Sequence, residues 1–269
     1  MDRVMLREDP YRMFHGSRTP PGLYARKKWL QEEGTDRWRG DFNATVSALY
    51  QGQSSDGLWD GSAVETIQRL FGLHLTVRAP DARIHAALDR LLAMAAAPDR
   101  KKSDERIEAD RLAGLPFAPG PRQPLVLAAT LFLVTIFGRG TDPTVLGLYR
   151  GITSDDGEIA GDWTDPDLLN NRLRALAVHP RYNNHETARV AVERLAQKQT
   201  SRGDCGDAFP FFQTLNALAH LSIPSAEAQC RKAFGLLARI QQADGTWGRA
   251  EPVWCTFLSI HALRNQGTI

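Results

Sequence analysis

Apolar side chains recur at helical spacing along most of the chain, and alternating strand patterns are nearly absent. Segment 81–97 carries one apolar stripe, with Asp81 as its expected N-cap. Segments 185–199 and 225–241 also divide into an apolar and a charged face, and Ser225 is the expected cap of the second. These three segments are predicted to be amphipathic helices.

Two further segments, 208–221 and 252–265, are apolar on nearly all sides, as buried helices are. Breakers such as Pro80 and Pro98 separate the helical segments from one another. The pattern predicts about ten or eleven helices and an all-α fold. The longest apolar run, 125–137, is too short to span a bilayer and better suits a buried helix.

A short motif recurs along the chain. Segments 53–59 (QSSDGLW) and 241–247 (QQADGTW) both read Q-x-x-D-G-x-W, while 199–205 (QTSRGDC) and 153–159 (TSDDGEI) are degraded copies. Successive copies begin 100, 46 and 42 residues apart, and the first interval has room for one more copy. A period in the forties indicates a repeat built from helix pairs.

The motif suits a tight turn between two helices. Glycine supplies a positive φ, aspartate bonds the backbone amides of the turn, and tryptophan covers the junction with an apolar ring. A threonine follows each good copy in the next helix, Thr66 after the first and Thr256 after the second. We interpret the motif residues as structural, with direct ligand binding as the alternative.

Repeated Q-x-x-D-G-x-W turns before apolar helices resemble those of squalene and hopene cyclases and other class II terpene cyclases. They are similar to the repeats of protein prenyltransferase β subunits too. The resemblance covers roughly residues 40–265 and implies an α/α toroid, in which inner helices surround a cavity that binds isoprenoid chains. We therefore expect a single toroid over 40–269, with 1–39 as an extension packed on it. An incomplete ring, closed by a partner, stays an alternative.

The resemblance also indicates where an acid could lie. Class II cyclases protonate an alkene or epoxide with an aspartate of a D-x-D-D motif, and the nearest match is segment 204–207 (DCGD). It retains Asp204 and Asp207 but has Gly206 at the central acid. We take Asp207 and Asp204 as the candidate catalytic residues. The alternative is that one of them caps the helix predicted over 208–221.

Polar and aromatic residues of the expected inner helices form the candidate binding site. Aromatic rings can line an apolar cavity and stabilise a cation, although such residues are also ordinary core. The candidate substrate-binding residues are Glu65, Phe211, Phe212, Gln213, Asn216, Trp254, Phe257 and His261.

No metal or other cofactor is predicted, although two metal sites stay open as alternatives. Cys205, Asp207 and His261 have the residue types of a zinc site, in an order that differs from the prenyltransferases. The acidic stretch 155–167 has carboxylates that suit magnesium and a diphosphate. The basic run 26–28 is a second candidate for contact with a diphosphate or an anionic headgroup, with a solvated charge run as the alternative.

Composition narrows the function classes. Lys and Arg number 33 against 31 Asp and Glu, and this near balance disfavours a nucleic-acid partner. Three cysteines are few and odd in number, which disfavours a disulfide framework and indicates a reducing compartment. Segment 1–12 is charged throughout and has no apolar signal region. These features predict a cytoplasmic protein; peripheral membrane contact, a partner subunit and a homodimer stay open.

Three functions follow from these observations. The leading hypothesis is a terpene cyclase-like protein that binds an isoprenoid or other apolar substrate and cyclises it by acid initiation. The second is a non-catalytic toroid that binds a lipid or a protein, because the central acid is missing. The third is carbohydrate chemistry by a carboxylate pair on the same fold.

Overall fold

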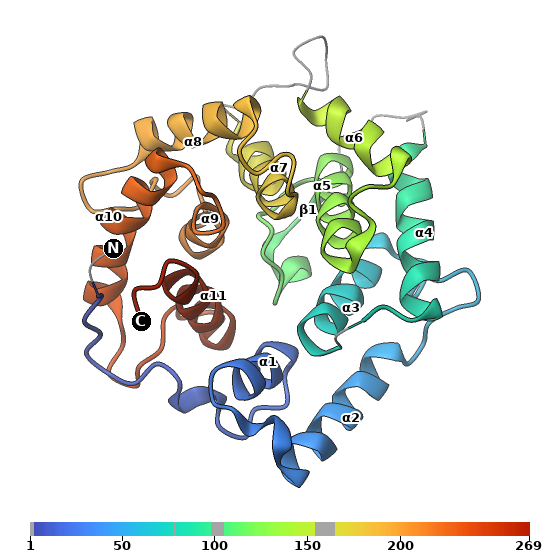
Figure 1. The fold of residues 1–269 in the computed structure, drawn as a ribbon, viewed down its shortest axis with the longest axis horizontal. Helices are drawn as coiled ribbons and strands as arrows, with labels where there is room; N and C mark the ends of the chain where they lie inside the picture. Colours follow the sequence, from blue (N-terminus) through green and yellow to red (C-terminus); the bar gives the residue numbers. More distant parts are fainter. Residues whose placement is uncertain (1–2, 78, 98–104, 154–164) are drawn as a thin grey trace.

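A computed structural model describes residues 3–77, 79–97, 105–153 and 165–269. Within these residues the chain forms eleven α-helices and one two-residue strand pair (Figure 1). The helices are α1 (Pro20–Lys28), α2 (Asp36–Tyr50), α3 (Ala63–Thr76), α4 (Ala82–Ala96), α5 (Arg122–Val134), α6 (Pro143–Thr153), α7 (Pro166–Val178), α8 (Glu186–Lys198), α9 (Phe211–Leu218), α10 (Pro224–Ile240) and α11 (Pro252–Asn265).

Shorter elements join these helices. Strand β1 (Arg106–Ile107) pairs antiparallel with β2 (Gly120–Pro121). The 3-10 turns are η1 (Arg12–Phe14), η2 (Glu32–Gly34) and η3 (Ala109–Leu112), and α5 continues into a π-helical turn, η4 (Thr135–Arg139). In the described residues, no helix is both long and apolar enough to cross a bilayer.

The odd-numbered helices form an inner ring, and the even-numbered helices lie outside it (Figure 1). Each inner helix contacts the next along the chain, and α11 contacts α1, so the inner ring closes on itself. The all-α prediction and the α/α toroid are thereby confirmed. Helix α1 comes from the segment 1–39 and lies between α3 and α11. The division of the chain at residue 40 stays a prediction.

Local sequence sets most helix ends, with two corrections. The Asp81 carboxylate accepts from the backbone N–H of Ile84 at 2.9 Å, so its predicted cap of α4 is confirmed. The predicted cap by Ser225 is wrong, because α10 begins at Pro224 with Ile223 as N-cap. The helix predicted over 208–221 is shorter than expected, since Pro210 is the N-cap of α9.

Three turns, at residues 53–59, 199–205 and 241–247, form the same hydrogen bonds. In each, the glutamine Nε2 donates to the carbonyl oxygen four residues on, at 3.0 to 3.1 Å. It also donates across to the backbone of another segment. The acceptors there are the carbonyl oxygens of Arg83, Gln229 and Glu8. The glutamines therefore tie the first two turns to the next outer helix, α4 or α10, and the last turn to the N-terminal segment.

The glycine of the turn packs closely against the backbone of another segment of the chain. Gly57 has a φ of +89°, and a Cβ there would lie 2.7 Å from the carbonyl group of Ala86 in α4. Gly245 has a φ of +88°, and its Cβ would lie 2.4 Å from the carbonyl oxygen of Asp9. Only glycine combines this conformation with such close packing.

The tryptophans of the two complete copies are buried, and both their backbone and their indole N–H groups donate hydrogen bonds. The backbone N–H of Trp59 donates to Thr66 Oγ1 at 3.1 Å, and that of Trp247 donates to Thr256 Oγ1 at 2.9 Å. Their indole N–H groups donate to carbonyl oxygens of the preceding helix or its C-cap. These contacts are structural, as the interpretation of the motif from the sequence expects, and neither indole lines the cavity that the inner helices surround.

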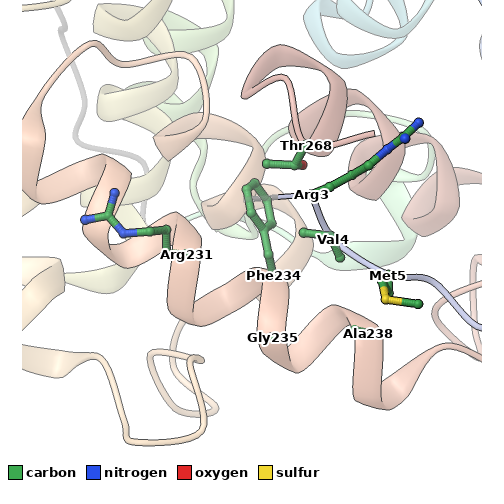
Figure 2. Close-up of a pocket in the computed structure, with 8 residues that line it drawn as sticks. All are labelled: Arg3, Val4, Met5, Arg231, Phe234, Gly235, Ala238 and Thr268. Carbon is green, nitrogen blue, oxygen red and sulfur yellow. The ribbon is translucent and has the colours of Figure 1, made fainter. Parts of the chain in front are cut away.

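The start of the chain runs along α10 and meets the end of the chain. Gln241 Oε1 accepts from the backbone N–H groups of Arg7 and Glu8 at 2.9 and 3.2 Å. The backbone N–H of Val4 donates to the carbonyl oxygen of Thr268 at 3.0 Å, close to α10 (Figure 2). The last Q-x-x-D-G-x-W turn is thus packed against the N-terminal segment rather than against another repeat.

Candidate functional site

The inner ring encloses a cavity of about 430 Å³, within the size range of ligand pockets. All six inner helices, or residues directly after them, contribute to its wall. The lining residues are Tyr24, Phe71, His74, Leu75, Phe132, Ile136, Arg174, Ala177, Val178, Asn216, His220, Trp254, Phe257, Leu258 and His261. The cavity lies at the axis of the toroid.

One side of the cavity is a continuous aromatic surface. Trp254 stacks on Phe257 with ring centroids 5.3 Å apart, and Phe71 meets Trp254 edge-on at 5.7 Å. Trp254 is held in place because its indole N–H donates to the carbonyl oxygen of Leu115 at 2.9 Å. Tyr24 meets Phe257 edge-on at 5.4 Å. Such a surface suits an apolar chain or a developing cation.

Three histidines add polar groups to this wall. Burial, with a smaller contribution from the charge on Arg174, lowers the pKa of His74 and His261 to about 4. The same causes lower the pKa of His220 well below its usual value. All three imidazoles are therefore neutral at pH 7. His220 Nδ1 lies 2.6 Å from the carbonyl oxygen of Asn216, so it carries the proton and donates.

Arg174 is the charged residue of the cavity. It is 5% exposed, and burial lowers its pKa to about 9, so the guanidinium stays protonated at pH 7. Its Cζ lies 5.0 Å from the ring centre of Phe132. Its Nη1 is 3.4 Å from the Asn216 carbonyl oxygen, and its Nε has no hydrogen-bond partner. Among the residues that the structure describes, no carboxylate pairs with Arg174 or lines the cavity.

A second hollow, of about 480 Å³, shares part of its wall with the cavity. Both are lined by Tyr24, His74, Leu75 and Ile136, and the second adds Lys27, Lys28 and Pro80 among others. Ile136 belongs to the π-helical turn η4, a feature that is frequent at functional sites. Arg26, the first residue of the basic run, does not line this hollow and is instead paired with Glu32 and Asp41.

Half of the predicted binding residues line the cavity: Asn216, Trp254, Phe257 and His261. The other four lie elsewhere. Phe211 lines a small separate pocket beside the 199–205 turn, and Glu65 pairs with Arg69 at 2.7 Å. Phe212 and Gln213 precede the cavity-lining part of α9 and do not contact the cavity.

The two candidate acids do not reach the cavity. Asp204 accepts from Thr200 Oγ1 at 2.9 Å and from the backbone N–H of Gly206 at 3.2 Å, within its own turn. Asp207 is exposed. Neither caps a helix, because α9 has no side-chain cap, so the capping alternative is wrong.

The metal alternatives find no support in the described part of the chain. No group of three or more His, Cys, Asp or Glu side chains there is arranged to hold a metal ion. Cys205 lines the small pocket beside its turn, whereas His261 faces the central cavity. Most of the acidic stretch, residues 154–164 with Asp155, Asp156, Glu158 and Asp162, lies outside the described residues.

Sequence reasoning did not single out Arg174, His74 or Tyr24. In the sequence, Arg174 is a charged residue among the apolar residues of α7. An arginine at such a position is normally interpreted as part of a solvated helix face. Tyr24 comes from α1, which precedes the first motif copy.

Another hollow, of about 320 Å³, lies on the outside of α10 (Figure 2). It is bounded by residues 3–5 and by Phe234, Gly235 and Ala238. Met5 is 89% exposed there, and the side chains of Arg3 and Arg231 extend in opposite directions. The hollow therefore lacks the converging polar groups of the central cavity.

Comparison with solved structures gives the fold a context. The type II terpene cyclase MstE from Scytonema, in complex with its substrate geranylgeranyl dihydroxybenzoate, matches with a TM-score of 0.57 and 14% identity, over 93% of this chain and 86% of that chain. A second MstE structure matches over 100% and 91%. The chain has a terpene cyclase-like fold.

The same fold also occurs in another class of protein. Native alpha-2-macroglobulin from Escherichia coli matches with a TM-score of 0.57 and 17% identity, over 97% of this chain and 42% of that chain. No family model and no curated protein matches the sequence. At these identities the comparisons define the fold, and the function must come from the site.

Proposed function

We propose that the protein binds an apolar, isoprenoid-like molecule in its central cavity. The observation that carries the proposal is the aromatic wall, to which Phe71, Trp254 and Phe257 contribute from two inner helices. The ring of inner helices places this apolar surface at the axis of the toroid. The substrate of the structurally similar MstE, geranylgeranyl dihydroxybenzoate, supports the same class of ligand.

Binding is favoured over acid-initiated cyclisation. Cyclisation needs a carboxylic acid close to the reacting double bond, and among the described residues no carboxyl group lines the cavity. The neutral imidazoles and the guanidinium are poor substitutes, since neither carries a readily released proton at pH 7. For the cyclase hypothesis to hold, Asp207 would have to move inward from its exposed position, or Asp204 would have to leave the hydrogen bonds of its own turn.

A variant that fills the cavity tests the proposal. Ala177 lines the cavity and is 5% exposed, so Ala177→Phe places a ring in the ligand's space. With farnesol as probe and isothermal titration calorimetry as readout, we expect binding to wild type and at least about 10-fold weaker binding to the variant.

Ala238→Phe is the matched control, because it makes the same change in the hollow outside α10. Farnesol affinity should be unaltered in this variant. Absence of binding to wild type, or loss of binding in Ala238→Phe alone, contradicts the proposal.

A further inference from the structure

Arg174 is built into the cavity wall without a counter-charge. Removing a guanidinium from water costs free energy that a nearby carboxylate normally offsets. Among the described residues no such carboxylate contacts Arg174, and its Nε is buried without a hydrogen-bond partner. A charged group of this kind, in a cavity of ligand size, marks a functional site.

Two other polar atoms of the same wall lack partners. Asn216 Oδ1 and His261 Nδ1 are buried without a hydrogen bond, and both residues line the cavity. His261 stacks on His220 with ring centroids 5.1 Å apart, and His220 Nδ1 and Arg174 Nη1 both donate to the carbonyl oxygen of Asn216, at 2.6 and 3.4 Å. These side chains therefore form one cluster, in which Arg174 Nε, and His261 Nδ1 when it carries the proton, can donate to an oxygen of a ligand, whereas Asn216 Oδ1 can only accept.

The charge of the cluster indicates what charge the head group of a ligand would carry. The three imidazoles are neutral at pH 7, so Arg174 supplies the one formal charge among the described residues of the cavity wall. A single guanidinium neutralises a single negative charge, and its planar fork matches the two oxygens of a carboxylate. A diphosphate carries more charge than this wall offsets.

We propose that Arg174 binds the carboxylate of an isoprenoid carboxylic acid whose hydrocarbon chain lies against Trp254 and Phe257. The ligand is thus an amphipathic monoanion, buried head first beside α7, with His261 Nδ1 as a second donor when it carries the proton. The inference rests on the proposed function, because it assigns a head group to the molecule that the aromatic wall binds.

The test compares two probes with the same chain. Farnesoic acid and farnesol differ at one end only, and both are titrated calorimetrically into wild type and Arg174→Met at pH 7. Wild type should bind the acid at least about 10-fold more tightly than the alcohol, and Arg174→Met should abolish this preference. Arg231→Met, which removes an exposed arginine outside the cavity, should preserve it.

The outcomes separate the two proposals. If neither probe binds wild type, the proposed function itself fails. If both bind wild type equally, the aromatic cavity stands and the carboxylate site is overturned. Tighter binding of farnesyl diphosphate than of farnesoic acid overturns the assignment to a monoanion.

Thermal unfolding distinguishes a binding role for Arg174 from a structural one. Replacing a buried charge that has no counter-charge with an apolar side chain should raise the Tm of the ligand-free protein. Farnesoic acid should then stabilise wild type more than Arg174→Met. A lower Tm in Arg174→Met would assign the arginine a structural role and overturn the proposal.

Discussion

The histidines at the centre of the ring link stability to pH. His74 and His261 have pKa values of about 4 in the folded protein, below the ordinary 6.5 of an unfolded chain. Between these values the unfolded state binds more protons than the folded state, so the free energy of unfolding falls as the pH falls.

We expect acidification from pH 7 to pH 5 to reduce the free energy of unfolding by about 2 kcal/mol for each of these histidines. Denaturant unfolding at the two pH values measures the reduction. In His261→Phe the reduction in the free energy of unfolding should be smaller by the contribution of one histidine, about 2 kcal/mol. An unchanged difference between the two pH values would show that His261 is charged or exposed in the folded protein.

At this scale the sequence predicts apolar site residues better than charged ones. Trp254, Phe257 and His261 are expected in the cavity because their helix is apolar on nearly all sides. Arg174 is not expected there, since an arginine in a helix is normally solvated, and only the packing of neighbouring helices reveals its burial. The choice of Asp204 and Asp207 rests on motif resemblance, which carries no information on the direction of their side chains.

The helical elements are joined by turns whose glycines cannot be replaced without cost. Gly52 and Gly57 both have a positive φ, but only the Cβ of an alanine at 57 would collide with α4. A Cβ at position 52 would meet no atom within 4 Å. The pair therefore separates backbone strain from packing.

Gly52→Ala should lower the free energy of unfolding by about 1 kcal/mol, the cost of the left-handed conformation alone. Gly57→Ala should lower it by about 2 kcal/mol more, because the backbone of α4 must shift as well. Chemical denaturation of both variants measures the difference. Equal losses would mean that the turn adjusts freely and that the motif does not fix the contact with α4.

Helix positions follow from the sequence more closely than helix ends do. The periodicity over 81–97 predicts α4 to within a residue at each end, and 252–265 coincides with α11. The predicted ends of α9 are wrong because Pro210 and the residues after Leu218 stop the helix, although the apolar run continues. A hydrophobic pattern locates a helix, whereas proline and capping geometry decide its length.

In the whole molecule, the closure of the inner ring cannot be predicted from the Q-x-x-D-G-x-W motif alone. The contact between α1 and α11 closes the inner ring, yet α1 follows no copy of the motif. In the turn after α10, Gln241 Oε1 also accepts from the backbone N–H groups of Arg7 and Glu8, more than 230 residues away in the chain. Long-range closure of this kind depends on tertiary packing, which local patterns do not encode. The shared fold of MstE and alpha-2-macroglobulin likewise leaves function to the site.

If an apolar chain occupies the axis of the toroid, photo-crosslinking will locate it there. A farnesol analogue with a diazirine at the chain end would be irradiated with wild type and the labelled peptides identified by mass spectrometry. We expect label on peptides from α3, α5 and α11, which carry Phe71, Phe132, Trp254 and Phe257. Label confined to residues 3–5 and α10, around the hollow of Figure 2, would contradict this expectation.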